Sequence, residues 1–280
     1  MNALPAMAPR YWPARLRLGF SDRAGETLLS ERWHQGPLRV QRPFYPESRQ
    51  VCHVYLLHPP GGLVSGDELC IDIDVGRDAW ALLTTPGAGK VYCSDGQGVR
   101  QQQTLRIARG GTLEWLPQEM ILFEGARAEL ATRVELEDEA RFLGWEISCL
   151  GRPASNEPLR HGDLRQRFEL WRDGRPLWLE RSHYRDQSPV FEAAWGLRGH
   201  SVIGTLVCSP VPEGVAVALR DALPPGDDAL FAITQRDGVL LVRYLGDSAE
   251  QARSRLGAAW HWLRQAVLGR AAVPPRIWNC

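Results

Sequence analysis

A two-residue alternation of apolar and polar side chains is the feature that most constrains the fold of this chain. In the segment 69–75 every second side chain is apolar, and two of the residues between them are Asp72 and Asp74. The segments 128–136 and 16–20 repeat the pattern. Successive side chains of a β-strand point to opposite faces, so each segment predicts a strand with one buried face.

Two other kinds of strand signal accompany this alternation. The segments 51–57 and 79–84 are more continuously apolar, which is typical of strands buried on both faces. Asp-Gly pairs supply the positive φ angles that tight hairpin turns require. Two such pairs join predicted hairpins: Asp173-Gly174 between 165–171 and 177–181, and Asp237-Gly238 between 230–235 and 239–244.

One long helix is predicted near the end of the chain. Ser248 is placed to cap it, Gln251 lies three residues on as the return partner, and Gly269 ends it. A shorter helix is expected over 190–197. The predicted fold class is therefore mainly β, with stacked or layered sheets and one or two peripheral helices, in a single domain that spans residues 1–280.

Composition excludes several classes of function. The formal net charge is zero and 44% of the residues are hydrophobic, so no basic stripe predicts a nucleic-acid partner or an anionic membrane surface. No run of about 20 apolar residues is long enough to span a membrane. Residues 1–12 lack the apolar core of a signal peptide and are expected to be flexible. The six cysteines are scattered, which favours free thiols in a reducing compartment.

Three motifs of catalysis or ligand binding fail on their spacing. A phosphate-binding loop ending at Lys90 would need glycine where Thr84 stands and serine or threonine where Val91 stands. The Gly62–Gly66 segment places its serine wrongly for a nucleophile elbow. The seven histidines have no metal-ligand spacing, so no tight metal site is expected.

Four glycine-rich blocks with neighbouring acidic residues remain, and they follow one another along the chain. They are residues 58–67, 84–92, 114–126 and 142–153, and the chain ends with a further short motif, Pro275-Arg276-Ile277-Trp278. In order and separation, these blocks resemble the signature blocks of the UreD/UreH family of urease accessory proteins. The similarity covers residues 51–153 and resumes at the last few residues.

The resemblance implies a non-enzymatic chaperone of urease metallocentre assembly. Members of that family have a helical stack of β-sheets and work in the cytoplasm. They bind urease apoprotein and pair with a UreF-type accessory protein, and that pair docks a UreG-type GTPase. Nickel reaches urease through a water-filled tunnel, so nickel is expected only in transit and no cofactor is expected to be tightly bound.

Scattered carboxylates and hydroxyls suit such a tunnel, because they lower the cost of carrying a divalent cation without closing a coordination shell around it. Glu146 is the strongest candidate, since it shares a strand face with Phe142 and Ser148 in a segment that is otherwise apolar. An ion pair with an arginine is the alternative interpretation of Glu146. The tunnel-wall candidates are Asp67, Glu119, Glu146, Ser148 and Glu180.

Each of the other candidates also has a structural interpretation. Asp67 follows a glycine turn and is equally consistent with a turn cap. Glu180 fits an exposed sheet face, and Glu119 fits a turn. Lys90, the only lysine in the chain, is expected to pair with one of these acids, with Thr84 and Thr85 as supporting polar residues.

Two alternative functions stay open at this point. A β-rich hydrolase would need two carboxylates in one cleft, and Glu146 with Glu180 is the pair to test. A scaffold with no role in metal transit would bind the same partners without using these side chains.

Overall fold

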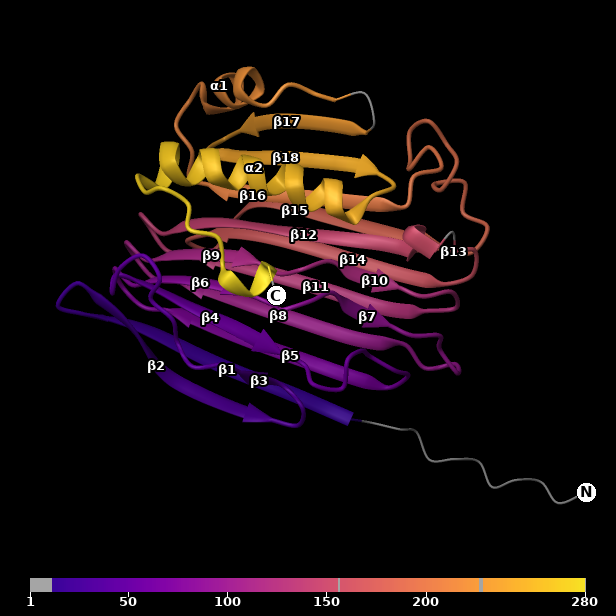
Figure 1. The fold of residues 1–280 in the computed structure, drawn as a ribbon, viewed down its shortest axis with the longest axis horizontal. Helices are drawn as coiled ribbons and strands as arrows, with labels where there is room; N and C mark the ends of the chain where they lie inside the picture. Colours follow the sequence, from indigo (N-terminus) through magenta and orange to yellow (C-terminus); the bar gives the residue numbers. More distant parts are fainter. Residues whose placement is uncertain (1–11, 156, 227–228, 280) are drawn as a thin grey trace, which may run out of the picture.

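Two layered β-sheets and two α-helices make up the protein (Figure 1). The computed structural model describes residues 12–155, 157–226 and 229–279. The predicted fold class, mainly β with peripheral helices, is confirmed. The segment 1–12, expected to be flexible, lies outside the described residues except for Trp12, which begins the first strand.

The smaller sheet has seven strands in the order β15-β14-β11-β8-β5-β1-β2. Their bounds are β1 Trp12–Arg23, β2 Glu26–Gln35, β5 Asp67–Val75, β8 Val99–Ile107, β11 Arg127–Leu136, β14 Asp163–Arg172 and β15 Arg175–Arg185. Two of the alternating segments, 69–75 and 128–136, are thus confirmed as β5 and β11. The first predicted hairpin is β14–β15, across its Asp-Gly turn.

The larger sheet has eight strands along its path, in the order β17-β18-β16-β12-β9-β6-β4-β3, and three short strands beside that path. The bounds along the path are β3 Arg39–Val40, β4 Val51–Leu57, β6 Trp80–Thr84, β9 Thr112–Leu116, β12 Arg141–Arg152, β16 Val202–Ser209, β17 Leu230–Arg236 and β18 Val239–Gly246. The short strands are β7 Gly89–Val91, β10 Met120–Leu122 and β13 Glu157–Pro158. The second predicted hairpin is β17–β18.

The chain winds between the two sheets as it proceeds. β5 of the smaller sheet is followed by β6 of the larger, β8 of the smaller by β9 of the larger, and β11 by β12. Neighbouring central strands therefore run parallel, since each return passes through the other sheet. This winding gives the helical stack of sheets that the family resemblance implied.

The central strands of the larger sheet are buried on both faces, and β12 shows how its sequence achieves this. Leu143, Trp145 and Ile147 point into a core that the C-terminal helix covers. Phe142 and Leu150 point into the core between the sheets. Continuous burial on two sides explains why this strand and β4 lack a simple alternation of apolar and polar residues.

The two helices cover the larger sheet on the face away from the smaller one (Figure 1). α2, Ala249–Leu268, begins where the Ser248 side chain accepts a hydrogen bond from the Gln251 amide and ends at Gly269 with φ 71°, as predicted. α1, Val215–Ala222, was not predicted. The helix expected over 190–197 is wrong: that segment consists of turns, because the chain folds back until Leu197 N donates to Val190 O.

Candidate functional site

A line of polar side chains crosses the otherwise apolar space between the two sheets. Thr132 on β11 and Ser148 on β12 are only 4% and 3% exposed, so they are part of the interior. We call the whole set the polar seam. Its members are Gln103, Thr132, Glu146, Ser148, Gln166, Glu180, Ser182, Thr205 and Arg243.

Glu146 lies at the centre of the polar seam and has only neutral partners. Its Oε1 contacts the hydroxyl of Thr132, and its Oε2 accepts a hydrogen bond of 3.0 Å from the side-chain amide of Gln166. Ser148 donates to the oxygen of that same amide at 3.3 Å. Within the residues that the structure describes, no arginine or lysine pairs with Glu146, so the ion-pair interpretation does not hold.

Burial between the sheets raises the pKa of the Glu146 carboxyl. The hydrogen bonds from Thr132 and Gln166 act in the opposite direction but do not cancel it, and the charge of Glu180 raises the pKa further. The number of available hydrogen-bond donors also favours a protonated Glu146. The single hydroxyl hydrogen of Thr132 cannot serve both Glu146 and Gln103 Oε1, which is 3.1 Å away, whereas a protonated Glu146 supplies the second hydrogen.

Glu180 belongs to the same site but is already neutralised. Arg243 of β18 donates to its two carboxylate oxygens at 3.0 and 2.8 Å, a bidentate pair that bridges the two sheets. Trp178 donates to it as well, at 3.2 Å. The exposed-face interpretation of Glu180 is therefore wrong, because the alternation of β15 turns this side chain toward the larger sheet.

A small cavity joins Glu146, Ser148 and Glu180. Its volume is about 40 Å³, and its other walls come from β14, β15 and β16. Pockets for small molecules usually measure hundreds of Å³, while one water in the liquid occupies about 30 Å³. The cavity thus has the size for a water molecule or a bare cation, and it is too small for a sugar ring between the two carboxyls.

The larger sheet is split beside Glu146. On β12, Gly144 pairs with Trp115 of β9, whereas Ser148 pairs with Met120 of β10, so residues 117–119 leave the ladder in between. Residues 85–88 separate β6 from β7 in the same way. Both interruptions contain a proline, which lacks the amide hydrogen that a ladder needs. The two interruptions therefore fall within two of the four glycine-rich blocks, 84–92 and 114–126.

Three predicted residues border the split, and two of them, Glu119 and Thr84, face the helices. Glu119 is 7% exposed and pairs with Arg253 of α2 at 3.0 Å. The Thr84 hydroxyl donates to Leu116 O and accepts from the Trp278 indole. The Thr85 hydroxyl accepts from the Gln118 amide across the split. The structure thus places Glu119 and Thr84 on the opposite side of the sheet from the polar seam, whereas Thr85 links the two interrupted segments.

Asp67 and Lys90 lie away from the polar seam as well. Asp67 is 5% exposed, and its side chain accepts a hydrogen bond of 2.9 Å from the Val64 amide, which is the turn-capping role. Lys90 stands opposite Ile121, which packs toward the helices. In the described part of the chain Lys90 forms no ion pair, so its expected pairing with an acid is wrong.

Sequence reasoning missed six members of the seam, and two of them are Ser182 and Thr205. The other four are Gln103, Thr132, Gln166 and Arg243. Each stands at a position of its strand where the alternation requires an apolar side chain. A polar residue on the buried face of four different strands is the signal that could have revealed them. Only the strand order shows that these faces meet.

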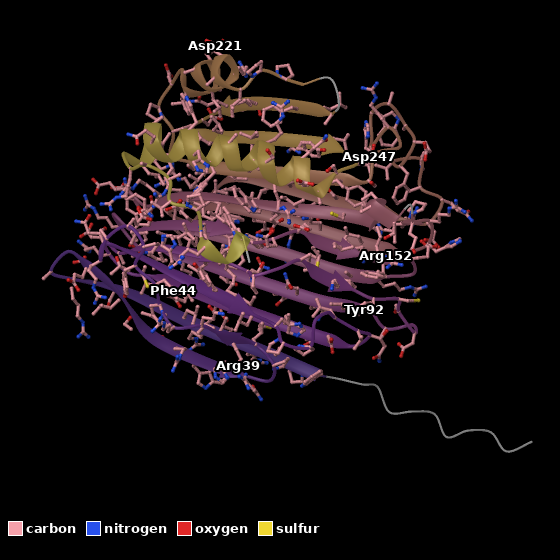
Figure 2. All side chains as sticks on the ribbon, viewed as in Figure 1. Arg39, Phe44, Tyr92, Arg152, Asp221 and Asp247 are labelled. Carbon is pink, nitrogen blue, oxygen red and sulfur yellow. The ribbon has the colours of Figure 1, made fainter. Side chains whose placement is uncertain are left out.

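The described residues also limit what the site is. They contain no group of three or more His, Cys, Asp or Glu side chains arranged to hold a metal ion. Among them, neither helix combines the length and apolarity needed to cross a membrane. Figure 2 shows Tyr92 and Arg152 at one end of the sheets. The strands β7 and β12, which flank the split, both terminate there.

Fold and site together define a class: a β-stack protein with a narrow polar interior between its two sheets. The UreD urease accessory protein family matches residues 13–279, and the chain belongs to that family. It is 48% identical to the urease accessory protein UreD of Chromohalobacter salexigens, over 96% of this chain and 89% of the relative. It is 45% identical to the UreD of Dechloromonas aromatica, over 99% of both chains.

Proposed function

We propose that this chain is a chaperone of urease maturation that binds urease apoprotein and passes nickel along the polar seam. A UreF-type protein and a UreG-type GTPase would complete the assembly, in the cytoplasm. Family membership supports the role in urease maturation, and the names of the relatives describe an accessory rather than a catalytic protein. The site geometry supports the finer part of the proposal.

Glu146 is the observation that carries the cation path. It is an acidic side chain in the protein interior with no cationic partner, beside a cavity that fits a single ion. A carboxyl group of this kind can exchange its proton for a cation in transit, and no ion pair has to be broken first. Glu180 contributes less, because Arg243 already occupies both of its oxygens.

The seam also lacks what would trap nickel. Imidazole and thiolate ligands bind nickel tightly, and the seam offers hydroxyl, amide and carboxyl oxygens instead. A site with one free carboxyl group and several neutral oxygens favours brief contacts over a closed shell. The ladder of the larger sheet is interrupted beside Glu146, where two of the signature blocks leave it, and we infer that the cation crosses the sheet there.

Replacement of Glu146 by glutamine tests the proposal with little change in shape. The chain is co-expressed with urease subunits and the accessory proteins, and the nickel content of purified urease is measured by mass spectrometry. We expect Glu146→Gln to keep the complex assembled and to slow nickel loading roughly tenfold, the effect of one lost charge-assisted contact.

Glu169→Gln is the matched control. Glu169 is also a buried carboxyl, 8% exposed, but it lies on the outer face of the smaller sheet against Arg133. Its replacement should leave nickel loading unchanged. Normal loading by Glu146→Gln, with assembly intact, would remove the conduit and leave a scaffold. Failure of the wild-type chain to capture apo-urease would reject the chaperone role itself.

A further inference from the structure

The two sheets end unevenly at one side of the molecule. β15, the last strand of the smaller sheet, lies over the larger sheet, since its Glu180 pairs with Arg243 of β18. β17 extends one strand further, at the side where α1 carries Asp221 (Figure 2). Since β15 is the end strand of the smaller sheet and lies over β18, no strand of that sheet covers β17 within the described residues.

The uncovered face of β17 can be identified from the register. Ile233 stands opposite Val242 and packs beneath the helices. The residues of β17 that alternate with Ile233 point toward the side of the smaller sheet. They are Leu230, Ala232, Thr234 and Arg236, and all four are exposed. Their β18 neighbours Val239 and Leu241 are 3% and 5% exposed, which marks where the cover stops.

The edge of β15 beside this face is long and open. The strand has 11 residues, and within the described residues only β14 pairs with it. The edge of the larger sheet at this side, β17, differs from the edge of β15. The Arg220 guanidinium of α1 donates to Ile233 O of β17 at 2.8 Å and so protects the β17 edge. An open strand edge presents backbone donors and acceptors to any further strand.

Charge at the β15 edge selects what can pair there. Arg167 of β14 stands directly opposite Arg181 of β15, an arrangement that is destabilising between like charges. In the part of the chain that the structure describes, Arg181 forms no ion pair. Arg181 and His183 line a hollow of about 380 Å³ over Ala131. A second copy of the same edge would add more positive charge, whereas an acidic segment would neutralise it.

We propose that the open edge of β15 and the exposed face of β17 form a docking groove for an extended acidic segment of a protein partner. The segment adds to β15 as an eighth strand and covers β17. Strand addition of this kind gains backbone hydrogen bonds, and alternate side chains give specificity. Its inward side chains are apolar, to lie on Leu230 and Ala232, and its outward ones are acidic, to lie beside Arg181. Cation passage plays no part in this binding.

A labelled ten-residue peptide that alternates valine and glutamate is the probe, and its binding to the full chain is measured by fluorescence anisotropy. Hydrogen exchange then locates the site. We expect the peptide to slow exchange in β15 and to leave β2, the other edge strand of that sheet, unchanged. A peptide with lysine in place of glutamate should bind at least tenfold more weakly.

Two variants test the groove without touching the seam. Ala232→Arg places a large cation on the exposed face of β17 and should weaken peptide binding at least tenfold. Val217→Arg is the matched control, because Val217 is 57% exposed on α1, outside the groove. Equal binding by both variants, protection of β2 instead of β15, or no binding of the acidic peptide to wild type would overturn the proposal. Equal protection of β15 by a single-stranded oligonucleotide would also overturn it, in favour of a nucleic-acid site.

Discussion

Glu146 combines a buried carboxyl group with partners that suit its protonated form. A raised folded-state pKa means that the folded chain keeps a proton which the unfolded chain releases near the ordinary value of 4.5. Stability therefore falls as the pH rises from that value toward the folded pKa, with a slope near 1.4 kcal/mol per pH unit.

Glu146→Gln should remove this pH dependence. Below pH 4.5 the variant and the wild type should unfold at similar urea concentrations, and above it the variant should become the more stable of the two. Urea unfolding at a series of pH values measures the difference. Parallel stability curves for both proteins across the whole range would show that the carboxyl group is not held neutral in the folded state.

The cysteines should differ sharply in reactivity. Burial raises the pKa of Cys149 and Cys208 to about 12 and that of Cys52 to about 11, while Cys93 is exposed. Only the thiolate reacts, so a maleimide should label Cys93 in the folded protein and reach the other three after unfolding. Mass spectrometry of labelled peptides gives the order. Early labelling of Cys208 would mean that the helix-covered core opens readily.

At the scale of elements, a buried ion network attaches α2 to the larger sheet. Glu114 of β9 and Arg264 of α2 are both fully buried, with 3.0 Å between the guanidinium Nε and each carboxylate oxygen. Arg264 also donates to Glu47, and Trp80 and Trp260 donate to Glu114. Every contact crosses between segments that are remote in the sequence.

Arg264→Met should lower the free energy of unfolding by about 3–5 kcal/mol, since it leaves the buried Glu114 carboxylate without its cation and removes from Glu47 the nearer of its two arginines. Arg255→Met, on the same helix, is the control, because Arg255 donates to the Pro224 carbonyl and lies over the Phe231 ring near the surface, without a buried carboxylate as its partner. Urea unfolding measures both. A loss below about 1 kcal/mol for Arg264→Met would indicate that water enters and solvates Glu114.

Local signals predicted about half of the strands, both Asp-Gly hairpins and α2 with its caps, because each depends on a few adjacent residues. The prediction of a helix over 190–197 was wrong because it also used adjacent residues alone. Its composition suits a helix, but Gly196 packs so closely on the Val190 carbonyl that a Cβ there would lie 2.1 Å from the oxygen. Contacts that override propensity in this way are not visible in a short window of sequence.

For the whole molecule, the C-terminus completes the helix-covered core. Trp278 packs on Trp145 and Trp260, and its indole donates to Thr84 at the end of β6. Removal of this half-buried ring by Trp278→Ala should cost about 3 kcal/mol, at the low end of the values for aromatic truncation. Thermal unfolding checks this, and Trp195→Ala, at a ring that is 75% exposed, is the control.

The candidate site shows where prediction from the sequence ends. The faces of β12 are local information, so Glu146 and Ser148 were correctly placed on the side of Phe142. The partners of Glu146 were not predictable in this way, because Thr132 and Gln166 come from strands whose neighbours are set by the winding between the sheets. Asp67 and Glu119 share composition and glycine-rich surroundings with Glu146, yet that winding separates them from it.

The winding also sets the order in which the layers form during synthesis. A ribosome adds about 5–20 residues per second, so strands of both sheets emerge in turn while α2 is still unmade. Until then the apolar side of the larger sheet, with Leu143 and Trp145, has no cover. The nascent chain therefore exposes an apolar surface through the second half of its synthesis, and its escape from aggregation depends on the last thirty or so residues arriving promptly.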